Sequence, residues 1–272
     1  MRAEDFAYLA GPRPLALAHR GGAAYGPNIG LENTMAAFRR AVELGYRYLE
    51  TDVHATRDSE VVAFHDSVLD RVTDRSGPIA ALPWSVVREA RVGGAEPVPL
   101  LAELFEEWPD VRVNIDVKAD TALGPTIREI QRHGAADRVC IGSFSERRLR
   151  AARQALGPGV ATAAGQVGTA MLRFTPAVLS RLLHTPAPVL QIPARHRVRG
   201  RTITLVTPGL VHRAHRLGKQ VHVWFHDWSR EDAGEMHRLL DLGVDGIVTD
   251  HIDVLRDVLA ARGTPLPGGR ES

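Results

Sequence analysis

Residues 48–66 read YLETDVHATRDSEVVAFHD, and this stretch holds two apolar runs that each end in polar residues. The runs are Tyr48–Val53 and Val61–Phe64, and the polar residues at their ends are Glu50, Asp52, His54, His65 and Asp66. Barrel enzymes carry their active sites at the C-terminal ends of their strands. The stretch therefore predicts two strands of an α/β fold, with the chemistry at one end.

Two further apolar runs end in the same way. LALAHRGG at 15–22 ends in His19 and Arg20, and VRVNIDVK at 111–118 carries Asn114, Asp116 and Lys118. Because the C-terminal ends of parallel strands meet at one edge, we expect these side chains to gather there.

Strand and helix patterns alternate along the 272 residues, which favours a parallel sheet. The predicted strands are Leu15–Ala18, Tyr48–Val53, Val61–Phe64, Val111–Val117, Val139–Gly142, Val160–Ala163, Val189–Ile192, Val221–Phe225 and Asp245–Val248. The predicted helices are Glu32–Leu44, Leu100–Trp108, Thr121–His133, Glu146–Leu156, Pro176–Leu183, Pro208–Leu217, Arg230–Leu242 and Val254–Ala261. Glycines stand where helices should stop, at Gly45, Gly134, Gly157, Gly218 and Gly243.

The length favours one catalytic domain over 1–272, folded as a somewhat irregular (β/α)8 TIM-type barrel, with a doubly wound open sheet as the alternative. Nine strands are one too many for this barrel, and Asp52–Val61 is too short for a crossover helix. Either one strand lies outside the barrel, or the second and third strands are joined irregularly. Residues 67–99 interrupt the alternation, and we expect them to form a small insertion after the third strand, over the barrel mouth, with a short helix near Ser85–Arg91.

Composition excludes several classes of protein. Hydrophobic residues make up 44% and charged residues 24%, as in an ordinary globular protein. The single cysteine, Cys140, allows no disulfide framework within the chain. We see no signal peptide and no segment that would insert into a membrane, so a cytoplasmic location is expected.

The net charge is only +2, and the densest basic stretch is RHRVRGR at 195–201. It indicates either a contact with nucleic acid or a solvated loop. The second interpretation is favoured, because the stretch has no interleaved aromatic residues and matches no reading motif. No nucleic-acid partner is expected.

The alternation of a strand places Glu50 and Asp52 on one face, and Asp116 and Lys118 on one face of another strand. If both faces look into the barrel, three carboxylates converge there and repel one another. One divalent cation would relieve this repulsion, and oxygen ligands select Mg²⁺ or Ca²⁺. The alternative is a structural polar layer in which the acids pair with Arg20 and Lys118.

Histidines can give or take a proton near neutral pH, and a phosphodiester displacement needs both steps. His19 and His65 end two strands beside the carboxylates and are the candidate catalytic pair. Arg20 and Lys118 are candidates for neutralising phosphate oxygens.

Read in order, HRGG, LENT, ETDV, VVAFHD, NIDVK, VHVW and GVDGIVTD resemble the glycerophosphodiester phosphodiesterase family, over about residues 14–260. The resemblance implies an irregular TIM barrel with a small insertion after the histidine-aspartate motif. It implies acid–base roles for His19 and His65, and phosphate contacts for Arg20 and Lys118.

The same resemblance assigns Glu50 and Asp52 as metal ligands, and Asp116 as the third ligand, where the family usually has glutamate. Glu32 is then a ligand, a group behind the ligands, or only a favourable charge at a helix start. Trp224 matches a residue that lines the substrate pocket, although VWFHD departs here from the family's VWTVN. The resemblance leaves two side chains with open roles. His54 is expected as a contact inside the barrel, and Asp250 as structural or substrate-facing.

The expected activity is metal-dependent hydrolysis of a small-molecule glycerophosphodiester to sn-glycerol 3-phosphate and an alcohol, in the metabolism of phospholipid headgroups. Two alternatives stay open: a phospholipase-like lyase on the same barrel that releases a cyclic phosphate, and a barrel that binds a phosphorylated metabolite without turnover. The sequence makes no prediction of oligomeric state.

Overall fold

Eight parallel strands stand side by side in the order β8-β7-β6-β2-β1-β13-β12-β9. They are β1 (Leu15–His19), β2 (Tyr48–Ala55), β6 (Arg112–Val117), β7 (Val139–Gly142), β8 (Ala161–Thr162), β9 (Val189–Pro193), β12 (Gln220–Trp224) and β13 (Gly246–Thr249). A parallel bridge between Ala163 and Val189 brings the two outer strands together. In this computed structural model, which describes residues 1–165, 168–170, 185–198, 201–225 and 231–267, the predicted barrel is confirmed and the open sheet is wrong.

The third predicted strand, Val61–Phe64, lies outside the barrel. β3 (Val61–Ala63) runs antiparallel to β2, with Val53 opposite Ala63 and Ala55 opposite Val61. Two antiparallel strands need only a short connection, whereas parallel strands need a crossover. The short link after Asp52 is therefore a hairpin, which explains why nine strands were predicted for a barrel of eight.

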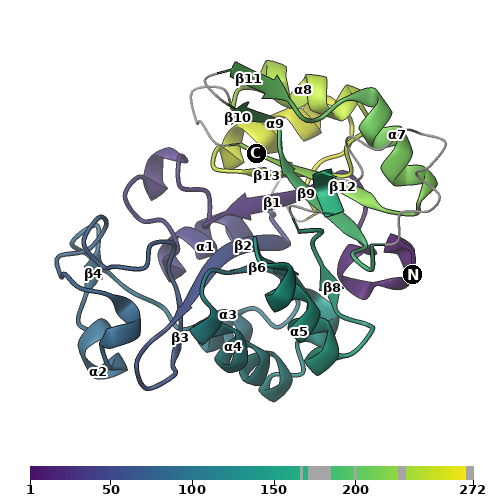
Figure 1. Cartoon of the computed structure of the whole chain (residues 1–272). Coiled ribbons are helices and arrows are strands. Elements are labelled where there is room, and N and C mark those ends of the chain that lie inside the picture. The colour runs from purple at the N-terminus through teal and green to yellow at the C-terminus, as the bar shows by residue number, and fades with distance from the viewer. Residues whose placement is uncertain (166–167, 171–184, 199–200, 226–230, 268–272) are drawn as a thin grey trace.

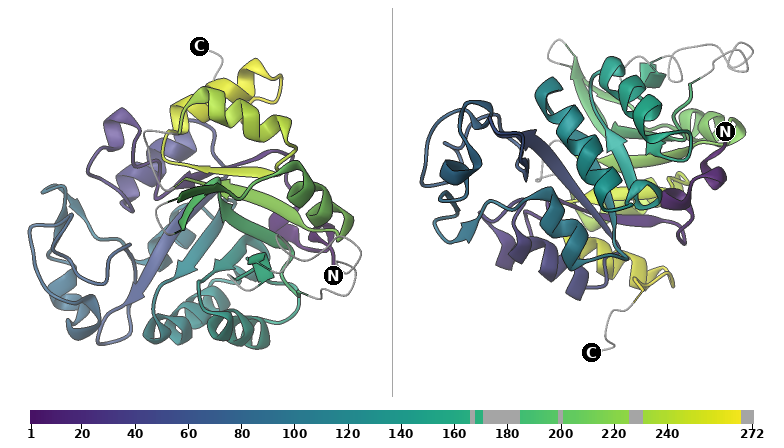
Figure 2. Two further views of the ribbon diagram at one scale, coloured as in Figure 1. Left: turned by 45° about the horizontal axis from the view of Figure 1, so that its top comes forward. Right: turned by 90° about the horizontal axis from the view of Figure 1, so that it is seen from below.

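Helices cover the outside of the barrel (Figures 1 and 2). They are α1 (Met35–Glu43), α3 (Leu101–Glu107), α4 (Asp120–Arg132), α5 (Glu146–Leu156), α7 (Pro208–Arg216), α8 (Ala233–Asp241) and α9 (Ile252–Ala261). The five predicted stop glycines all have positive φ, which glycine adopts without steric cost. The helix predicted at 176–183 lies outside the described residues. No described helix has the length and apolar character needed to cross a membrane.

The two faces of β6 differ as its alternation predicts. Ile115 and Val117 are buried among side chains of α3, α4 and α5. Asn114 points the other way and exchanges side-chain hydrogen bonds with Gln191 of β9, with Gln191 Nε2 donating to Asn114 Oδ1 at 2.8 Å. Because β9 is not a neighbour of β6, this contact crosses the barrel, and the row containing Asp116 and Lys118 faces its interior.

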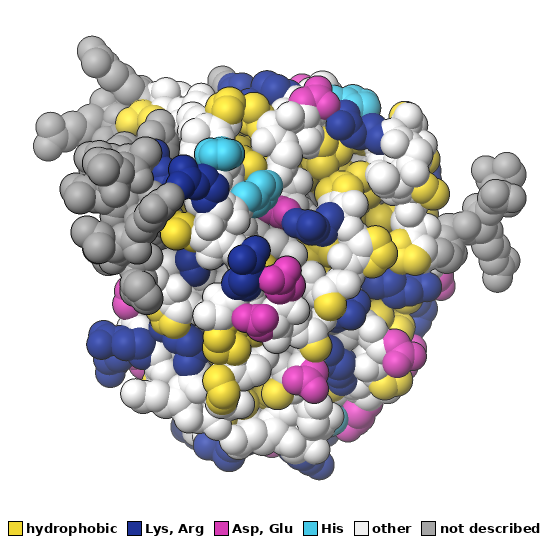
Figure 3. Space-filling model, turned by 90° about the vertical axis from the view of Figure 1, so that its right-hand side faces the viewer, with side chains coloured by type: hydrophobic (Ala, Val, Ile, Leu, Met, Phe, Trp, Pro, Cys, Tyr) yellow, Lys and Arg dark blue, Asp and Glu magenta, His cyan; other side chains and the backbone are white. Residues whose placement is uncertain are grey.

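The N-terminal segment closes the N-terminal end of the barrel, with two short 3₁₀ helices, η1 (Ala3–Asp5) and η2 (Ala7–Leu9). Tyr48 Oη donates to Tyr8 O at 2.9 Å, and Gln220 Nε2 donates to Leu9 O at 3.2 Å. Figure 3 shows this side of the molecule, where acidic, basic and histidine side chains are intermixed on the described surface.

Residues 67–99 lie at the opposite side of the molecule from the N-terminus (Figures 1 and 2). They contain η4 (Ile79–Ala81), α2 (Trp84–Val87), β4 (Arg91–Val92) and β5 (Glu96–Pro97), and β4 and β5 were not predicted. The segment has a hydrophobic cluster of its own, which includes Leu69, Ile79, Val87 and Val92, together with Phe64.

The basic stretch at 195–201 is not the expected loop. Its described residues form β10 (Arg195–Val198) and the start of β11 (Arg201–Thr204), which pair antiparallel after β9. Arginine recurs at every second residue of this stretch, which is the period of a strand. Strands are normally recognised by an alternation of apolar and polar residues, and this stretch has no apolar face.

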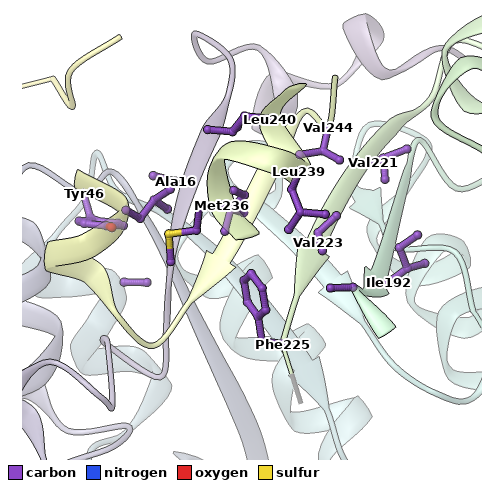
Figure 4. Close-up of a cluster of buried hydrophobic side chains, with 14 of the residues drawn as sticks. Ala16, Tyr46, Ile192, Val221, Val223, Phe225, Met236, Leu239, Leu240 and Val244 are labelled. Carbon is purple, nitrogen blue, oxygen red and sulfur yellow. The ribbon is translucent and has the colours of Figure 1, made fainter. Parts of the chain in front are cut away.

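The largest hydrophobic cluster packs α7, α8 and α9 against β12 and β13, and Figure 4 shows part of it around Met236, Leu239 and Val223. Leu239 is fully buried. Leu239→Ala is expected to lower the free energy of unfolding by about 2–5 kcal/mol, because it removes buried surface and leaves a cavity. Denaturant unfolding would measure the loss. Val86→Ala, at a side chain that is 41% exposed, is the control, and equal losses in the two variants would contradict this account.

Candidate active site

The polar strand ends meet through the register of three neighbouring strands. His19 of β1 stands opposite Glu50 of β2, and Asp52 of β2 stands opposite Asp116 of β6. The structure thus brings both carboxylate rows and one histidine to the C-terminal end of the barrel. Within this group Glu50 and Asp52 are almost fully buried.

The HRGG turn fits closely against the start of α1. Gly21 has φ of 84°, and a Cβ there would lie 2.8 Å from the Cβ of Ala37, so only glycine fits. Arg20 itself has φ of 50°, a conformation unusual for a residue with a side chain. Its backbone N–H donates to Glu50 Oε2 at 3.3 Å, which ties the turn to β2.

Two cations neutralise the carboxylates. Lys118 Nζ lies 2.8 Å from Asp52 Oδ1 and 2.7 Å from Asp116 Oδ2, while Arg20 Nε lies 3.0 Å from Asp52 Oδ2. Burial acts to raise the pKa of Asp52, but Arg20 and Lys118 outweigh it and hold the pKa below its usual range. The pairing of these acids with Arg20 and Lys118, which the sequence left as an alternative, is therefore present.

The negative charge of Glu50 is less well neutralised by nearby cations than that of Asp52. Burial and the neighbouring charge of Asp52 raise its pKa above the usual range for a carboxyl group. The described residues contain no group of three or more His, Cys, Asp or Glu side chains arranged to hold a metal ion. The carboxylate oxygens of Glu50, Asp52 and Asp116 are nevertheless of the kind that a hard divalent cation binds, and Lys118 Nζ lies between Asp52 and Asp116.

His19 is held between two acids. Its Nδ1 lies 2.8 Å from Asp250 Oδ2, and its Nε2 lies 3.7 Å from Glu50 Oε2. Burial acts to lower the pKa of His19, but Asp250 and Glu50 raise it to about 9. The contact with Asp250 fixes the ring so that Nε2 faces the carboxylates.

His65 has an aspartate of its own. Its Nδ1 lies 2.6 Å from Asp66 Oδ1, and Arg71 Nε donates to Asp66 Oδ2 at 2.5 Å. Arg71 also forms a two-pronged ion pair with Glu32, at 2.6 and 3.0 Å, and Glu32 Oε1 lies 3.3 Å from Arg20 Nη1. Glu32 therefore forms ion pairs with both Arg20 and Arg71.

His54 and Trp224, the other two predicted site residues, lie on β2 and β12. His54 Nε2 lies 3.1 Å from the backbone oxygen of His65, so it supports the second histidine from β2. Burial lowers the pKa of His54. Trp224 ends β12 and is partly buried against the cluster that fills the barrel interior. The altered motif after it includes His226 and Asp227, which lie outside the described residues.

Three residues form contacts that the sequence did not predict. Asp66 was named as a strand-end residue and Asp250 as structural or substrate-facing, but neither was predicted to hold a histidine. Arg71, which was not named, connects Asp66 to Glu32. Asp250 ends the GVDGIVTD run and Asp66 follows His65, so both carry the strand-end signal used for the other residues. Arg71 lies within the insertion and carries no such signal.

Residues 19–254 match the model of the Glycerophosphoryl diester phosphodiesterase family. "Probable glycerophosphodiester phosphodiesterase 2" of Mycobacterium tuberculosis is 42% identical over 92% of this chain and 92% of its own length. A human lysophospholipase D is 29% identical over 89% of this chain and 85% of its own length.

Solved structures share the fold. A "Putative glycerophosphoryl diester phosphodiesterase" from Silicibacter pomeroyi superposes with a TM-score of 0.77 at 22% identity, covering 96% of this chain and 99% of its own. A phosphodiesterase from Oleispira antarctica, solved with the product sn-glycerol-3-phosphate, has a TM-score of 0.73 at 22% identity, covering 91% and 97% of the two chains. The predicted resemblance and the predicted class of phosphoric diester hydrolase are confirmed. The chain belongs to the glycerophosphoryl diester phosphodiesterase family.

Proposed function

We propose that this protein hydrolyses glycerophosphodiesters, adding water across the phosphodiester to release sn-glycerol 3-phosphate and a free alcohol. The observation that carries the proposal is the pair of histidine–aspartate contacts, His19 with Asp250 and His65 with Asp66, beside the cations Arg20 and Lys118. In each histidine Nδ1 is engaged, which leaves Nε2 for proton transfer. The cations supply the charge that a phosphate needs.

In this proposal one histidine removes the proton of the attacking hydroxyl, which belongs either to water or to the glycerol 2-hydroxyl. The other histidine protonates the departing alcohol oxygen as the bond from phosphorus to that oxygen breaks. Attack by the 2-hydroxyl forms a cyclic phosphate, and water must open it to complete the hydrolysis. Trp224, at the end of β12, is proposed to line the pocket for the substrate.

We further propose Glu50, Asp52 and Asp116 as the residues that would hold Mg²⁺ or Ca²⁺. Bound there, the cation would stabilise negative charge on the phosphate oxygens. Asp116 is one methylene shorter than a glutamate, and its carboxylate pairs with Lys118 at 2.7 Å. A role in phospholipid headgroup metabolism would follow from the substrate.

The insertion is proposed as one wall of the site within a single catalytic domain. Its Arg71 reaches Glu32, on the segment between β1 and α1, and Asp66 beside the second histidine. The insertion would therefore hold His65 in place through Asp66.

The test is turnover of a panel of glycerophosphodiesters that differ in the alcohol, with products followed by phosphorus NMR. We expect sn-glycerol 3-phosphate from at least one member. A cyclic phosphate as the final product would favour the lyase alternative. Absence of turnover with every member, in the presence of Mg²⁺ or Ca²⁺, would contradict the proposal.

Lysophospholipids are the second substrate class in the panel. Phe144 is 60% exposed and Ile29 is 70% exposed, and they follow β7 and β1 at the barrel's C-terminal end. This class is proposed because a human lysophospholipase D is 29% identical to this chain over 89% of it, and an acyl chain would need apolar surface at the barrel mouth. Faster turnover of lysophospholipids than of their deacylated counterparts would favour this class.

A further inference from the structure

Glu231 is a buried acid that the proposed chemistry does not use. It precedes α8 and is 3% exposed. Its Oε1 accepts a hydrogen bond from the backbone N–H of Asp250 at 2.8 Å and another from the hydroxyl of Thr249. Its Oε2 has no hydrogen-bond partner among the described residues.

The two donors belong to the turn that presents Asp250 to His19. Thr249 is the last residue of β13, and its hydroxyl also accepts from the backbone N–H of His251 at 3.0 Å. Glu231 therefore binds the backbone at the point where the chain leaves β13. From the same residue, Asp250, the side chain reaches 2.8 Å to His19 Nδ1.

Burying an acid in this position is costly, since the carboxylate loses its hydration. Burial and the nearby charge of Asp250 raise the pKa of Glu231 to about 7. A neutral side chain could accept the same hydrogen bonds from Thr249 and Asp250 without burying a second carboxylate next to that of Asp250. Glu231 Oε1 accepts from both donors at once and thereby fixes the turn, and an amide oxygen of the same reach could accept the same two hydrogen bonds.

We propose that Glu231 is a positioning residue for the catalytic histidine: it fixes the backbone of Thr249 and Asp250, and so sets the angle at which Asp250 holds His19. The proposal rests on the proposed function, because it assigns to Glu231 an effect on the proton transfer by His19. Misplacing a catalytic group by about 1 Å lowers the rate by up to about 100-fold, even when the substituted residue touches no substrate.

Two substitutions at the same position separate positioning from mere folding. Glu231→Ala removes the shared acceptor, and we expect kcat to fall by about 10- to 100-fold with little change in KM. Glu231→Gln keeps a side-chain oxygen of the same reach, and we expect kcat within about threefold of the wild type. A purely structural role would instead lower the unfolding midpoint in both variants without separating their kcat values.

Asp245 provides a matched control, because it precedes β13, the strand that ends at Thr249. It is a buried acid just before β13, at the opposite end of the barrel, and it pairs with Arg13 at 2.7 Å and His215 at 2.7 Å. Asp245→Ala is expected to lower thermal stability while leaving kcat of the folded enzyme unchanged. If Glu231→Ala behaves like Asp245→Ala, the positioning role is wrong.

A spectroscopic readout makes the test independent of the activity. In the wild type, the proton between His19 Nδ1 and Asp250 should give a strongly downfield proton NMR signal. The signal should weaken or move in Glu231→Ala and persist in Glu231→Gln. An unchanged signal and unchanged kcat in Glu231→Ala would overturn this inference alone, whereas an inactive wild type with an intact signal would overturn the proposed function.

Discussion

Replacing His19 with alanine is expected to lower kcat for a glycerophosphodiester by about 10²- to 10⁴-fold, the usual contribution of a general acid or base. The ring is held by Asp250 at 2.8 Å and faces Glu50 at 3.7 Å. Alanine can neither give nor take a proton. Steady-state turnover of the best substrate in the panel would measure the loss, with circular dichroism to confirm that the variant is folded.

His133 supplies the control for this experiment. It is also a histidine beside carboxylates, at 3.4 Å from Glu106 and 3.5 Å from Glu129, but it lies on the outside of the barrel after α4. His133→Ala is expected to keep wild-type kcat. Near-wild-type turnover in His19→Ala would remove His19 from the mechanism, whatever the family membership.

The alternation of single strands predicted much of this site. Asp116 and Lys118 could be assigned to the barrel interior because Ile115 and Val117 needed an apolar surface, and the structure places all four accordingly. The excess strand was visible as well, since the link after Asp52 was too short for a helix. Its resolution as a hairpin with β3 is a property of pairing, which no single run of residues specifies.

The contacts that hold the histidines were harder to predict. His19 and Asp250 are 231 positions apart in the sequence, and they meet because β1 and β13 are neighbours. That neighbourhood exists only once the barrel closes. Arg71 likewise reaches Glu32 through the fold of the insertion, which has no regular period to analyse. The alternation of side chains along a strand thus predicts which way a side chain points, but not which residue it contacts.

Removing divalent cations is the second change for which we expect a large effect. Treatment with a chelator should lower kcat/KM by about 10³-fold or more, since a bound metal ion contributes several kcal/mol to the stabilisation of transition-state charge. Addition of Mg²⁺ or Ca²⁺ should restore it. The chelated protein should keep its fold, because Lys118 and Arg20 form ion pairs with Asp52.

Calorimetric titration with Mg²⁺ and with Ca²⁺ gives a readout that does not depend on turnover. Asp52→Asn should weaken binding, because it removes a charge from the donor set. Lys118→Met should tighten binding, because the ammonium group between Asp52 and Asp116 competes with the cation for the same oxygens. It should also lower kcat, because Lys118 is proposed to contact the phosphate.

If chelation leaves activity intact and neither variant changes the titration, then Glu50, Asp52 and Asp116 form a structural polar cluster neutralised by Lys118 and Arg20. In that case the phosphate would be bound by protein cations alone.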